Sequence, residues 1–290
     1  MNGVLLINKP KDYTSHDIVA IVKKIYKEKV GHTGTLDPNA TGVLPLLVGK
    51  ATLISKYLMN HNKKYIAVLK LGVKTTTADG EGEIVEEKEV SKLAFLKENI
   101  EKVFEELVGK NEQIPPIYSA IKIKGKKLYE YARAGQEVLV QPRVIEIYSL
   151  NILEIHEESS EIKFEVACSK GTYIRSLCEN IAEKLETVGY MKDLQRTEVG
   201  NFNINQAIEL KKIQENRDNP EFLVESLISI EEIFKEKEYI SVCDKRLGMF
   251  LNGVKLPIMM PNSVYRIYNK NKFIGLGIVN NNQLKRDVII

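Results

Sequence analysis

Hydrophobic and polar residues follow two periods along the chain, one typical of strands and one typical of helices. A continuous hydrophobic run over residues 4–7 predicts a short buried strand, and Tyr65 to Leu71 predicts a second strand. Between them, hydrophobic side chains from Ile18 to Tyr26 recur at helical spacing. Thr14 and Asp17 have the spacing of a capping box, so we expect this helix to begin directly after Thr14.

The middle of the chain continues this mixture of periods. A helix is predicted from Ser91 to Val108, and strands are predicted over residues 144–155 and 162–168. A further helix is expected from Tyr173 to Leu185, with Thr172 able to cap it. Strands and helices are interspersed without a strict strand–helix–strand alternation and without an internal repeat. The pattern therefore favours an α+β fold with a mixed sheet over a doubly wound fold or a solenoid.

Two domains are expected from the length and from a change in composition. The 290 residues exceed a single small domain, and the charged run after Ile233 indicates a linker. From Tyr265 to Ile278 the residues alternate and include glycines, which predicts a small β module. We expect a large domain over residues 1–235 and a small one over 239–290. The longest hydrophobic runs are far shorter than the roughly 20 residues that cross a bilayer, so no membrane contact is expected.

Cysteine and histidine usage argues against a metalloenzyme and for a reducing compartment. Cys168, Cys178 and Cys243 leave one thiol over and show no C-x-x-C spacing, which is typical of a cytoplasmic protein. No secretory signal is evident at the amino end. The four histidines approach neither H-E-x-x-H nor one another in sequence, so no metal site is expected.

The net charge of +3 is distributed unevenly. Residues 239–290 carry eight Lys or Arg against Asp244 and Asp287, a charge of +6, so the rest of the chain sums to −3. A second basic segment, with tyrosines interleaved, lies within residues 117–135. Its basic residues are Lys122, Lys124, Lys126, Lys127 and Arg133. Aromatic side chains among lysines suit an RNA backbone with exposed bases, and a solvated hairpin is the alternative interpretation.

A glycine-rich segment over residues 31–52 contains the first candidate for chemistry. It ends in Gly-Lys-Ala-Thr, but Leu44 and Ala51 stand where a phosphate-binding P-loop needs Gly and Ser or Thr, so we reject a P-loop. The segment offers one carboxylate, Asp37, whose backbone Pro38 restricts to extended conformations. A plain turn is the alternative interpretation of this Asp-Pro pair.

Arg175 is the second candidate, because arginine is rare in this chain. Only eight of the 42 basic residues are arginine. Arg175 falls in the first turn of a predicted amphipathic helix, beside Ile174 and Leu177. A solvated arginine is the alternative, but a partly buried arginine needs an anion, and Asp37 is a candidate partner.

Ordered blocks of this sequence resemble the bacterial tRNA pseudouridine-55 synthases of the TruB type. The likeness covers residues 3–205, with a looser likeness near 240–290 to the family's small RNA-binding PUA-like tail. The GHTGTLDP block together with GTYIR makes the resemblance specific. The blocks are LLINKPKDYTS (5–15), GHTGTLDPNATGVLPLLVGKAT (31–52), KKYIAVLKLGVKTTTADGEG (63–82), PPIYSAIKIKGKKLYEYARAG (115–135), CSKGTYIRSLCENIAEKL (168–185) and LQRTEVGNF (194–202). Asp12 stands in the first block where glycine is common in the family.

The resemblance implies a fold, a reaction and a partner. The expected fold has a mixed, largely antiparallel central sheet flanked by helices and loops, with a small C-terminal β-rich PUA-like module. The expected reaction converts uridine 55 in the T-loop of tRNA to pseudouridine, without a metal or other cofactor. The partner implied is the T-stem-loop of tRNA, bound in part by an arm over residues 113–135. We expect the protein to act as a monomer in the cytoplasm.

The resemblance also implies roles for individual residues. Asp37 is the implied catalytic carboxylate and Arg175 its partner. Tyr65 is implied to stack on the extruded uracil and to lie where the family's candidate proton-transfer group lies. Residues with supporting roles are His32, which holds the surroundings of the flipped nucleotide, Tyr173 and Leu194, which line the pocket, and Lys9 and Pro10, which shape its floor.

The chemistry of the reaction agrees with a single ionised carboxylate. Exchanging the N1–C1′ bond for a C5–C1′ bond changes no oxidation state, and a neighbouring arginine is expected to keep Asp37 ionised. A glycosidase presents two carboxylates, whereas Asp79 lies in a different turn and is interpreted as structural. Two other functions stay open: a non-catalytic RNA chaperone or binding module, and a nucleotide hydrolase that releases free uracil.

Overall fold

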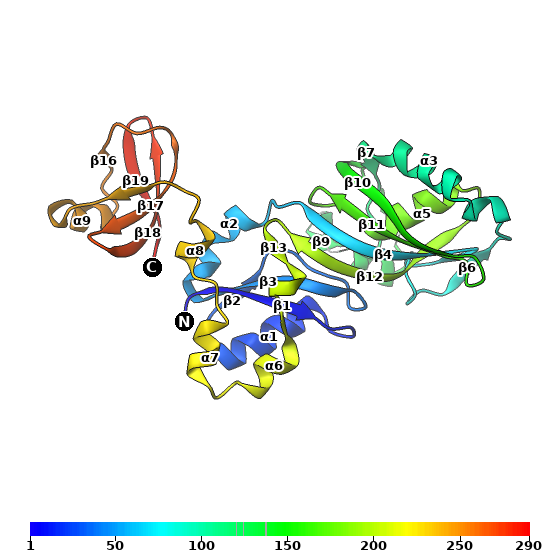
Figure 1. The fold of residues 1–290 in the computed structure, drawn as a ribbon, viewed down its shortest axis with the longest axis horizontal. Helices are drawn as coiled ribbons and strands as arrows, with labels where there is room; N and C mark the ends of the chain where they lie inside the picture. The colour runs from blue at the N-terminus through cyan, green and yellow to red at the C-terminus, as the bar shows by residue number, and fades with distance from the viewer. Residues whose placement is uncertain (120, 124, 137) are drawn as a thin grey trace.

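The computed structural model describes residues 1–290 except 120, 124 and 137 (Figure 1). Among these residues a ten-stranded sheet forms the body of the protein, in the order β14-β1-β3-β12-β4-β11-β10-β7, with β2 added beside β3 and β13 beside β12. Its strands are β1 (Gly3–Lys9), β2 (Val30–His32), β3 (Thr41–Val48), β4 (Lys63–Leu71), β7 (Gly109–Gln113), β10 (Arg143–His156), β11 (Glu161–Cys168), β12 (Gly189–Val199), β13 (Phe202–Asn203) and β14 (Ile208–Glu209). Only the β1–β14 and β3–β12 pairs are parallel, so the sheet is mixed and largely antiparallel, as expected.

Helices and short hairpins surround this sheet. The α-helices are α1 (Ser15–Tyr26), α2 (Ser55–Leu58), α3 (Lys97–Leu107), α4 (Leu128–Arg133), α5 (Ile174–Lys184), α6 (Leu210–Glu215), α7 (Pro220–Glu225), α8 (Ile230–Ile233) and α9 (Asp244–Leu251). The 3-10 helices are η1 (Gly49–Ile54), η2 (Lys92–Phe95) and η3 (Ile204–Gln206). Two separate hairpins pair β5 (Val73–Thr75) with β6 (Ile84–Glu87) and β8 (Lys122–Ile123) with β9 (Lys126–Lys127).

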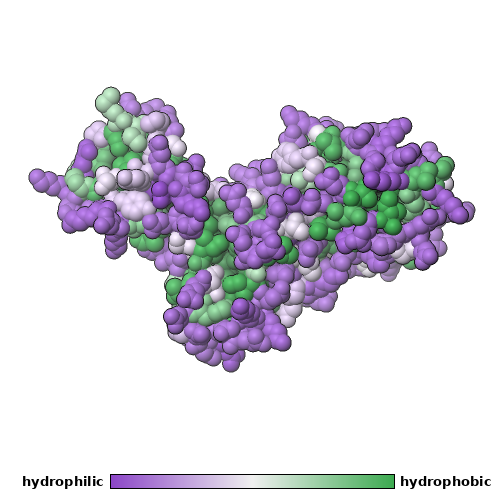
Figure 2. Space-filling model, in the orientation of Figure 1, coloured by the Kyte–Doolittle hydropathy of each residue, from purple (hydrophilic) through white to green (hydrophobic). Residues whose placement is uncertain are grey.

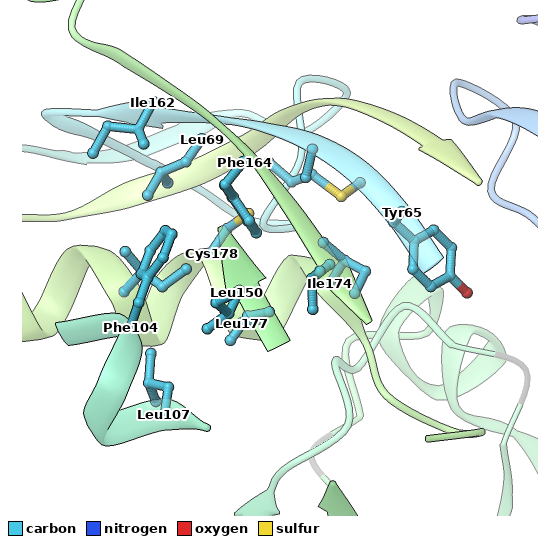
Figure 3. Close-up of a cluster of buried hydrophobic side chains, with 14 of the residues drawn as sticks. Tyr65, Leu69, Phe104, Leu107, Leu150, Ile162, Phe164, Ile174, Leu177 and Cys178 are labelled. Atoms are coloured by element: carbon cyan, nitrogen blue, oxygen red, sulfur yellow. The ribbon is translucent and has the colours of Figure 1, made fainter. Parts of the chain in front are cut away.

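The largest hydrophobic core lies where α3 and α5 cover one part of the sheet. Alternate residues of β4 and β11 point into it, because successive side chains of a strand face opposite sides. Figure 3 shows side chains from both helices meeting side chains of these strands. Those from the helices include Phe104, Leu107, Leu177 and Cys178, and those from the strands include Leu69, Ile162 and Phe164.

The periodicities placed most of these elements correctly. The strands expected near residues 4–7, 65–71, 144–155 and 162–168 are all present. Thr14 caps α1 with a complete capping box formed with Asp17, which confirms that prediction.

Two details of the predicted helices are wrong. The helix expected from Ser91 to Val108 is broken, because Leu96 is extended and separates η2 from α3. The side chain of Leu96 is half exposed, so it does not supply the inward contact that would continue a helix. Thr172 does not cap α5: its hydroxyl donates to the Ser169 carbonyl, and α5 begins after Tyr173 without a side-chain cap.

A second sheet begins at Tyr239 and has its own core. Its strands are β15 (Tyr239–Ser241), β16 (Leu256–Pro257), β17 (Ser263–Asn269), β18 (Lys272–Asn280) and β19 (Gln283–Ile289), in the order β15-β17-β18-β19-β16. Phe250, Tyr265 and Ile267 are buried in this module. The strands expected within residues 265–278 are therefore present.

The C-terminal module packs against the larger body beside α2 and α8 (Figure 1). Leu276 and Val288 of the module share a hydrophobic cluster with Phe234. Asp287 accepts a hydrogen bond of 2.6 Å from the Tyr57 hydroxyl and also pairs with Lys56. On the face in Figure 2, hydrophobic side chains gather at this junction, whereas hydrophilic ones cover most of the module. No helix within the described residues is long and hydrophobic enough to cross a bilayer.

Candidate active site

Asp37 lies in the loop that joins β2 to β3, and backbone hydrogen bonds fix this loop. The Ser15 hydroxyl, at the start of α1, accepts from the Leu36 amide at 2.9 Å and lies 3.2 Å from the Leu36 carbonyl. The Lys9 ammonium donates to the Pro38 carbonyl at 2.8 Å. The residues on both sides of Asp37 are therefore held in place, which orients its carboxylate.

Arg196 of β12 holds the same loop from beneath. Its side chain is 1% exposed, and it donates to the carbonyls of Val43, Thr35 and Gly34 at 2.8, 3.1 and 3.3 Å. Sequence reasoning did not identify Arg196 as a functional residue. The rarity of arginine and its place in the LQRTEVGNF block were the available signals.

Asp37 and Arg175 form an ion pair, as the sequence predicted. Arg175 Nε lies 3.1 Å from Asp37 Oδ2, and Arg175 Nη2 donates to Asp37 Oδ1 at 3.3 Å, so the contact is bidentate. Arg175 is 5% exposed, whereas 41% of the Asp37 side chain remains exposed. The arginine is therefore a fixed support, and the carboxylate keeps a face open to a ligand.

Asp79, from a different turn, joins the same cluster and supports Arg175. Its Oδ2 lies 3.5 Å from Arg175 Nη1, and the residue is 8% exposed. The guanidinium also donates to the carbonyls of Thr77 and Tyr118, at 3.2 and 3.0 Å. Arg175 thus contacts two carboxylates and two carbonyls, which together set its position.

Burial and three neighbouring charged groups set the pKa of Asp37. Burial raises the pKa of Asp37 above its ordinary value, against the opposing charge of Arg175, and Asp79 adds to the rise while Lys9 lowers it. The charge of Arg175 favours the ionised carboxylate, as the sequence predicted, but burial opposes it more strongly. Burial also lowers the pKa of Lys9 to about 8. The Lys9 ammonium donates to three backbone carbonyls, those of Pro10, Tyr13 and Pro38, so it supports the loop backbone beneath Asp37.

The first block also contains a strained backbone position. Asp12 adopts a φ of 66°, in the left-handed region that glycine enters most easily. Its amide donates to the Pro38 carbonyl at 3.1 Å, so this turn contacts the Asp37 loop directly. Glycine would adopt this conformation with less strain than aspartate.

Tyr65 and Leu194 come from neighbouring strands of the sheet. Tyr65 is 7% exposed, and burial raises its pKa to about 12, although a hydrogen bond with Arg196 opposes the rise. Figure 3 shows Tyr65 at one end of the buried cluster, with its hydroxyl directed away from the other labelled side chains. Leu194 lies on β12 and lines a small cavity together with Asp37 and Asp79.

Tyr173 is positioned by its backbone. The Gln113 side chain accepts from the Tyr173 amide at 2.8 Å and donates to the Tyr173 carbonyl at 3.0 Å. Burial raises the pKa of Tyr173, and the charges of Arg175 and Asp37 act on its hydroxyl. Tyr173 therefore lies within the electrostatic reach of the Asp37–Arg175 pair.

His32 lies in a different environment from the carboxylates. Its ring contacts His16 edge-on, with centroids 5.6 Å apart, and burial lowers the pKa of His32. In the described part of the chain, its buried Nδ1 has no hydrogen-bond partner and no hydrogen bond links His32 to Asp37. The structure thus brings together Asp37, Arg175 and Leu194 but does not place His32 in direct contact with them.

Family models match the chain over most of its length. The N-terminal domain of the TruB family pseudouridylate synthases matches residues 23–174, and the C-terminal domain of tRNA pseudouridylate synthase B matches residues 175–235. This chain belongs to the TruB family of pseudouridylate synthases.

Relatives and solved structures agree with that membership. A tRNA pseudouridine synthase B of Clostridium tetani is 44% identical over 96% of this chain and 95% of its own. A tRNA pseudouridine synthase B of Bacillus cytotoxicus is 47% identical over 88% of this chain and 84% of its own. A chain of an H/ACA ribonucleoprotein bound to a substrate RNA containing 2′-deoxyuridine superposes with a TM-score of 0.69 at 23% identity, covering 99% of this chain and 85% of that one. A chain from a Cbf5–Nop10–Gar1 complex superposes with a TM-score of 0.67 at 25% sequence identity, and the match covers 99% of this chain and 83% of that one. The expected fold is confirmed.

The basic arm of this TruB family member is a hairpin followed by a short helix. Lys122 lies on β8, and Lys126 and Lys127 form β9, with the Lys126 ammonium 4.6 Å from the centre of the Tyr131 ring. Sequence reasoning missed α4, whose first residue, Leu128, is fully buried. Lys124 lies outside the described residues, and the placement of the Arg133 side chain is not described.

The root of the arm contacts the first turn of α5. The Ser176 hydroxyl donates to the Ile114 carbonyl at 3.2 Å, and Arg175 donates to the Tyr118 carbonyl. Together with the contacts between Gln113 and Tyr173, these bonds join the arm to the helix that carries Arg175.

Among the described residues, no group of His, Cys, Asp and Glu side chains is arranged to hold a metal ion.

Proposed function

We propose that this chain converts uridine 55 in the T-loop of tRNA to pseudouridine, with Asp37 as the catalytic carboxylate. Membership of the TruB family and the names of its relatives support uridine isomerisation in tRNA. The observation that carries the residue assignment is the Asp37–Arg175 pair, in which a buried guanidinium holds a carboxylate that keeps an exposed face.

In this mechanism, Asp37 acts as an ionised carboxylate and Arg175 orients it through two contacts. Asp37 attacks C1′, attacks C6 or abstracts the 2′ proton, and each of these steps needs the unprotonated form. Asp79 fixes the far side of the guanidinium and contacts no reacting atom in this scheme. The detached base stays bound and returns through C5, so the reaction consumes no oxidant or other source of energy.

The uridine must leave its stack to reach Asp37. Flipping costs a few kcal/mol, and stacking on an aromatic ring such as Tyr65 returns about 1 to 3 kcal/mol. The cavity lined by Asp37, Asp79 and Leu194 has a volume of only about 20 Å³, which is room for about one water molecule. The uracil is too large for this cavity and therefore binds against the exposed face of Asp37. In this arrangement Tyr65, Tyr173 and Leu194 line the pocket, and His32 supports the flipped nucleotide.

The distribution of charge along the chain supports separate roles for its two parts. We assign catalysis to residues 1–235 and additional RNA binding to the PUA-like module of residues 239–290, whose charge is +6. Within the first part, an arm over residues 113–135 contacts the T-stem-loop. Its RNA-binding residues are Lys122, Lys124, Lys126, Lys127 and Arg133. The protein acts as a monomer in the cytoplasm, where its tRNA substrate is found.

Tritium release from tRNA labelled as [5-³H]uridine tests this function. Forming the C5–C1′ bond expels the C5 hydrogen, so turnover releases tritium while the base stays attached to the RNA. A nucleotide hydrolase releases labelled uracil instead, and an RNA chaperone releases no label. Either of the last two results contradicts the proposal. When tritium is released, sequencing of the product RNA locates the modified position.

A further inference from the structure

Lys63 lies on the face of the sheet that carries Tyr65. It is the first residue of β4, two positions before Tyr65, and alternate residues of a strand share a face. The two Cα atoms are therefore about 7 Å apart along the strand. In the sheet, Lys63 lies opposite Cys168 of β11 and Val199 of β12, so both neighbouring strands end beside it.

The positive charges of Arg196 and Lys170 act on Lys63 and disfavour its protonated form. Its ammonium donates to the His61 carbonyl at 2.7 Å, and the positive charges nearest to it belong to Arg196 and Lys170. Within the part of the chain that the structure describes, no carboxylate lies within ion-pair distance of Lys63. Burial, followed by Arg196 and Lys170, lowers the pKa of Lys63 to about 8, although Cys168 opposes this. A half-buried ammonium among cations is unfavourable unless an anion joins it.

The loop before Lys63 is held in one conformation. The Gly200 amide donates to the Asn62 carbonyl at 2.9 Å, and Gly200 has a φ of 57°. A Cβ at Gly200 would clash with the His61 ring, so a larger residue there requires this ring to move. The Lys170 ammonium donates to Asn60 Oδ1 at 2.6 Å. The loop therefore holds the two lysines through its oxygen atoms, and their ammonium groups supply the hydrogen-bond donors and positive charge of this surface.

We propose that Lys63 and Lys170, with the loop of residues 60–62, bind an RNA phosphate that flanks the nucleotide in the pocket. The inference rests on the proposed function, because it takes RNA as the ligand. A phosphate there supplies the negative charge that the described surroundings of Lys63 lack, and it adds acceptors for the ammonium groups. The short distance from Tyr65 makes this a contact with the backbone next to the flipped uridine, separate from the basic arm and from the C-terminal module.

Lys64 offers a matched control one residue away. It points to the opposite face of β4, and its ammonium lies 3.5 Å from Glu198 Oε1. Both lysines carry the same charge and lie on the same strand, but only Lys63 shares the face of Tyr65. Replacing either one with glutamine removes one positive charge from the same region of the protein.

The test measures binding of the full-length protein to a T-stem-loop RNA over a range of salt concentrations. For Lys63→Gln we expect binding about threefold to tenfold weaker at low salt, with the slope of log K against log salt flatter by about 0.7 to 0.9. We expect Lys64→Gln to keep the wild-type slope. We also expect Lys63→Arg to keep most of that slope, because the positive charge remains. In turnover assays Lys63→Gln raises KM far more than it lowers kcat. Thermal unfolding of each variant checks that the fold is intact.

Equal slopes for Lys63→Gln and Lys64→Gln overturn the phosphate site. If Lys63→Gln weakens the binding of inorganic phosphate but leaves the salt slope of RNA binding unchanged, the ligand is a free anion, and the proposal is also overturned. Absence of tritium release by the wild-type protein contradicts the proposed function instead. The binding slopes still decide the phosphate site in that case, so the two failures are distinguishable.

Discussion

At the scale of single residues, the raised pKa of Asp37 predicts an unusual acid limit of activity. The reaction needs the ionised carboxylate, so kcat/KM falls as pH drops through this raised pKa, above the ordinary carboxyl value near 3.9. Asp79 contributes to the rise, so Asp79→Asn moves the acid limit to lower pH. A pH profile of kcat/KM for both proteins measures the shift. An acid limit that stays in place in Asp79→Asn contradicts the electrostatic coupling of the two carboxylates.

The bidentate contact of Arg175 makes a second prediction at this scale. Arg175→Lys keeps the charge but loses the planar fork that reaches Asp37, Asp79 and two carbonyls. We expect a large fall in kcat in a protein that still folds, with a lower unfolding temperature because buried partners of Arg175 lose hydrogen bonds. Near-normal turnover of Arg175→Lys beside an inactive Arg175→Ala means that charge alone matters, and normal turnover of both removes Arg175 from the site.

The sequence revealed Asp37 and Arg175 but neither Asp79 nor Arg196 as their supports. A carboxylate in a glycine-rich loop and a rare arginine in an amphipathic helix are visible locally. By contrast, the contacts of Arg196 with Gly34 and Thr35 join strands and loops that are distant along the chain. Periodicity gives the face on which a residue lies, but not which loops meet there, so such contacts need the folded structure.

At the scale of elements, the contacts of Gln113 with Tyr173 predict a link between the arm and the catalytic helix. Gln113→Met keeps the volume and leaves the Tyr173 amide and carbonyl without these partners, which costs about 1 to 3 kcal/mol of unfolding free energy. Because Arg175 follows two residues later, we also expect kcat to fall. Urea unfolding and turnover measure both effects, with the exposed neighbour Glu112→Ala as control. Equal stability and turnover of both variants mean that the link contributes nothing.

Element boundaries illustrate the limits of local sequence signals. The capping box at Thr14 was predictable because its two partners lie three residues apart. The break at Leu96 was not, because the helical spacing of hydrophobic residues continues through it although its side chain faces solvent. The same reason applies to α4: its buried Leu128 lies within a lysine-rich segment that gives little hydrophobic signal.

At the scale of the whole molecule, the charge of the C-terminal module predicts a contribution to RNA affinity. Deleting the module would uncover the hydrophobic cluster that Leu276 and Val288 share with Phe234, so we replace charges instead. The exposed lysines chosen for change to glutamine are Lys245, Lys255, Lys272 and Lys285. We expect a flatter salt dependence, by about 0.7 to 0.9 for each RNA phosphate that the module no longer neutralises, with kcat retained at saturating RNA. An unchanged slope places the affinity elsewhere, in the arm.

The central claim is that Asp37 performs the chemistry on a tRNA that the rest of the molecule binds. The most direct test measures tritium release and tRNA binding by Asp37→Asn, which keeps the shape of the side chain and removes its charge. As a control, Asp193→Asn loses a carboxylate that lines the same small cavity but pairs with Lys11 at the surface. We expect Asp37→Asn to release no tritium above background while its tRNA affinity stays within about tenfold, or 1.4 kcal/mol, of the wild type, and Asp193→Asn to stay active. Measurable turnover by Asp37→Asn in a preparation free of wild-type enzyme would contradict the account.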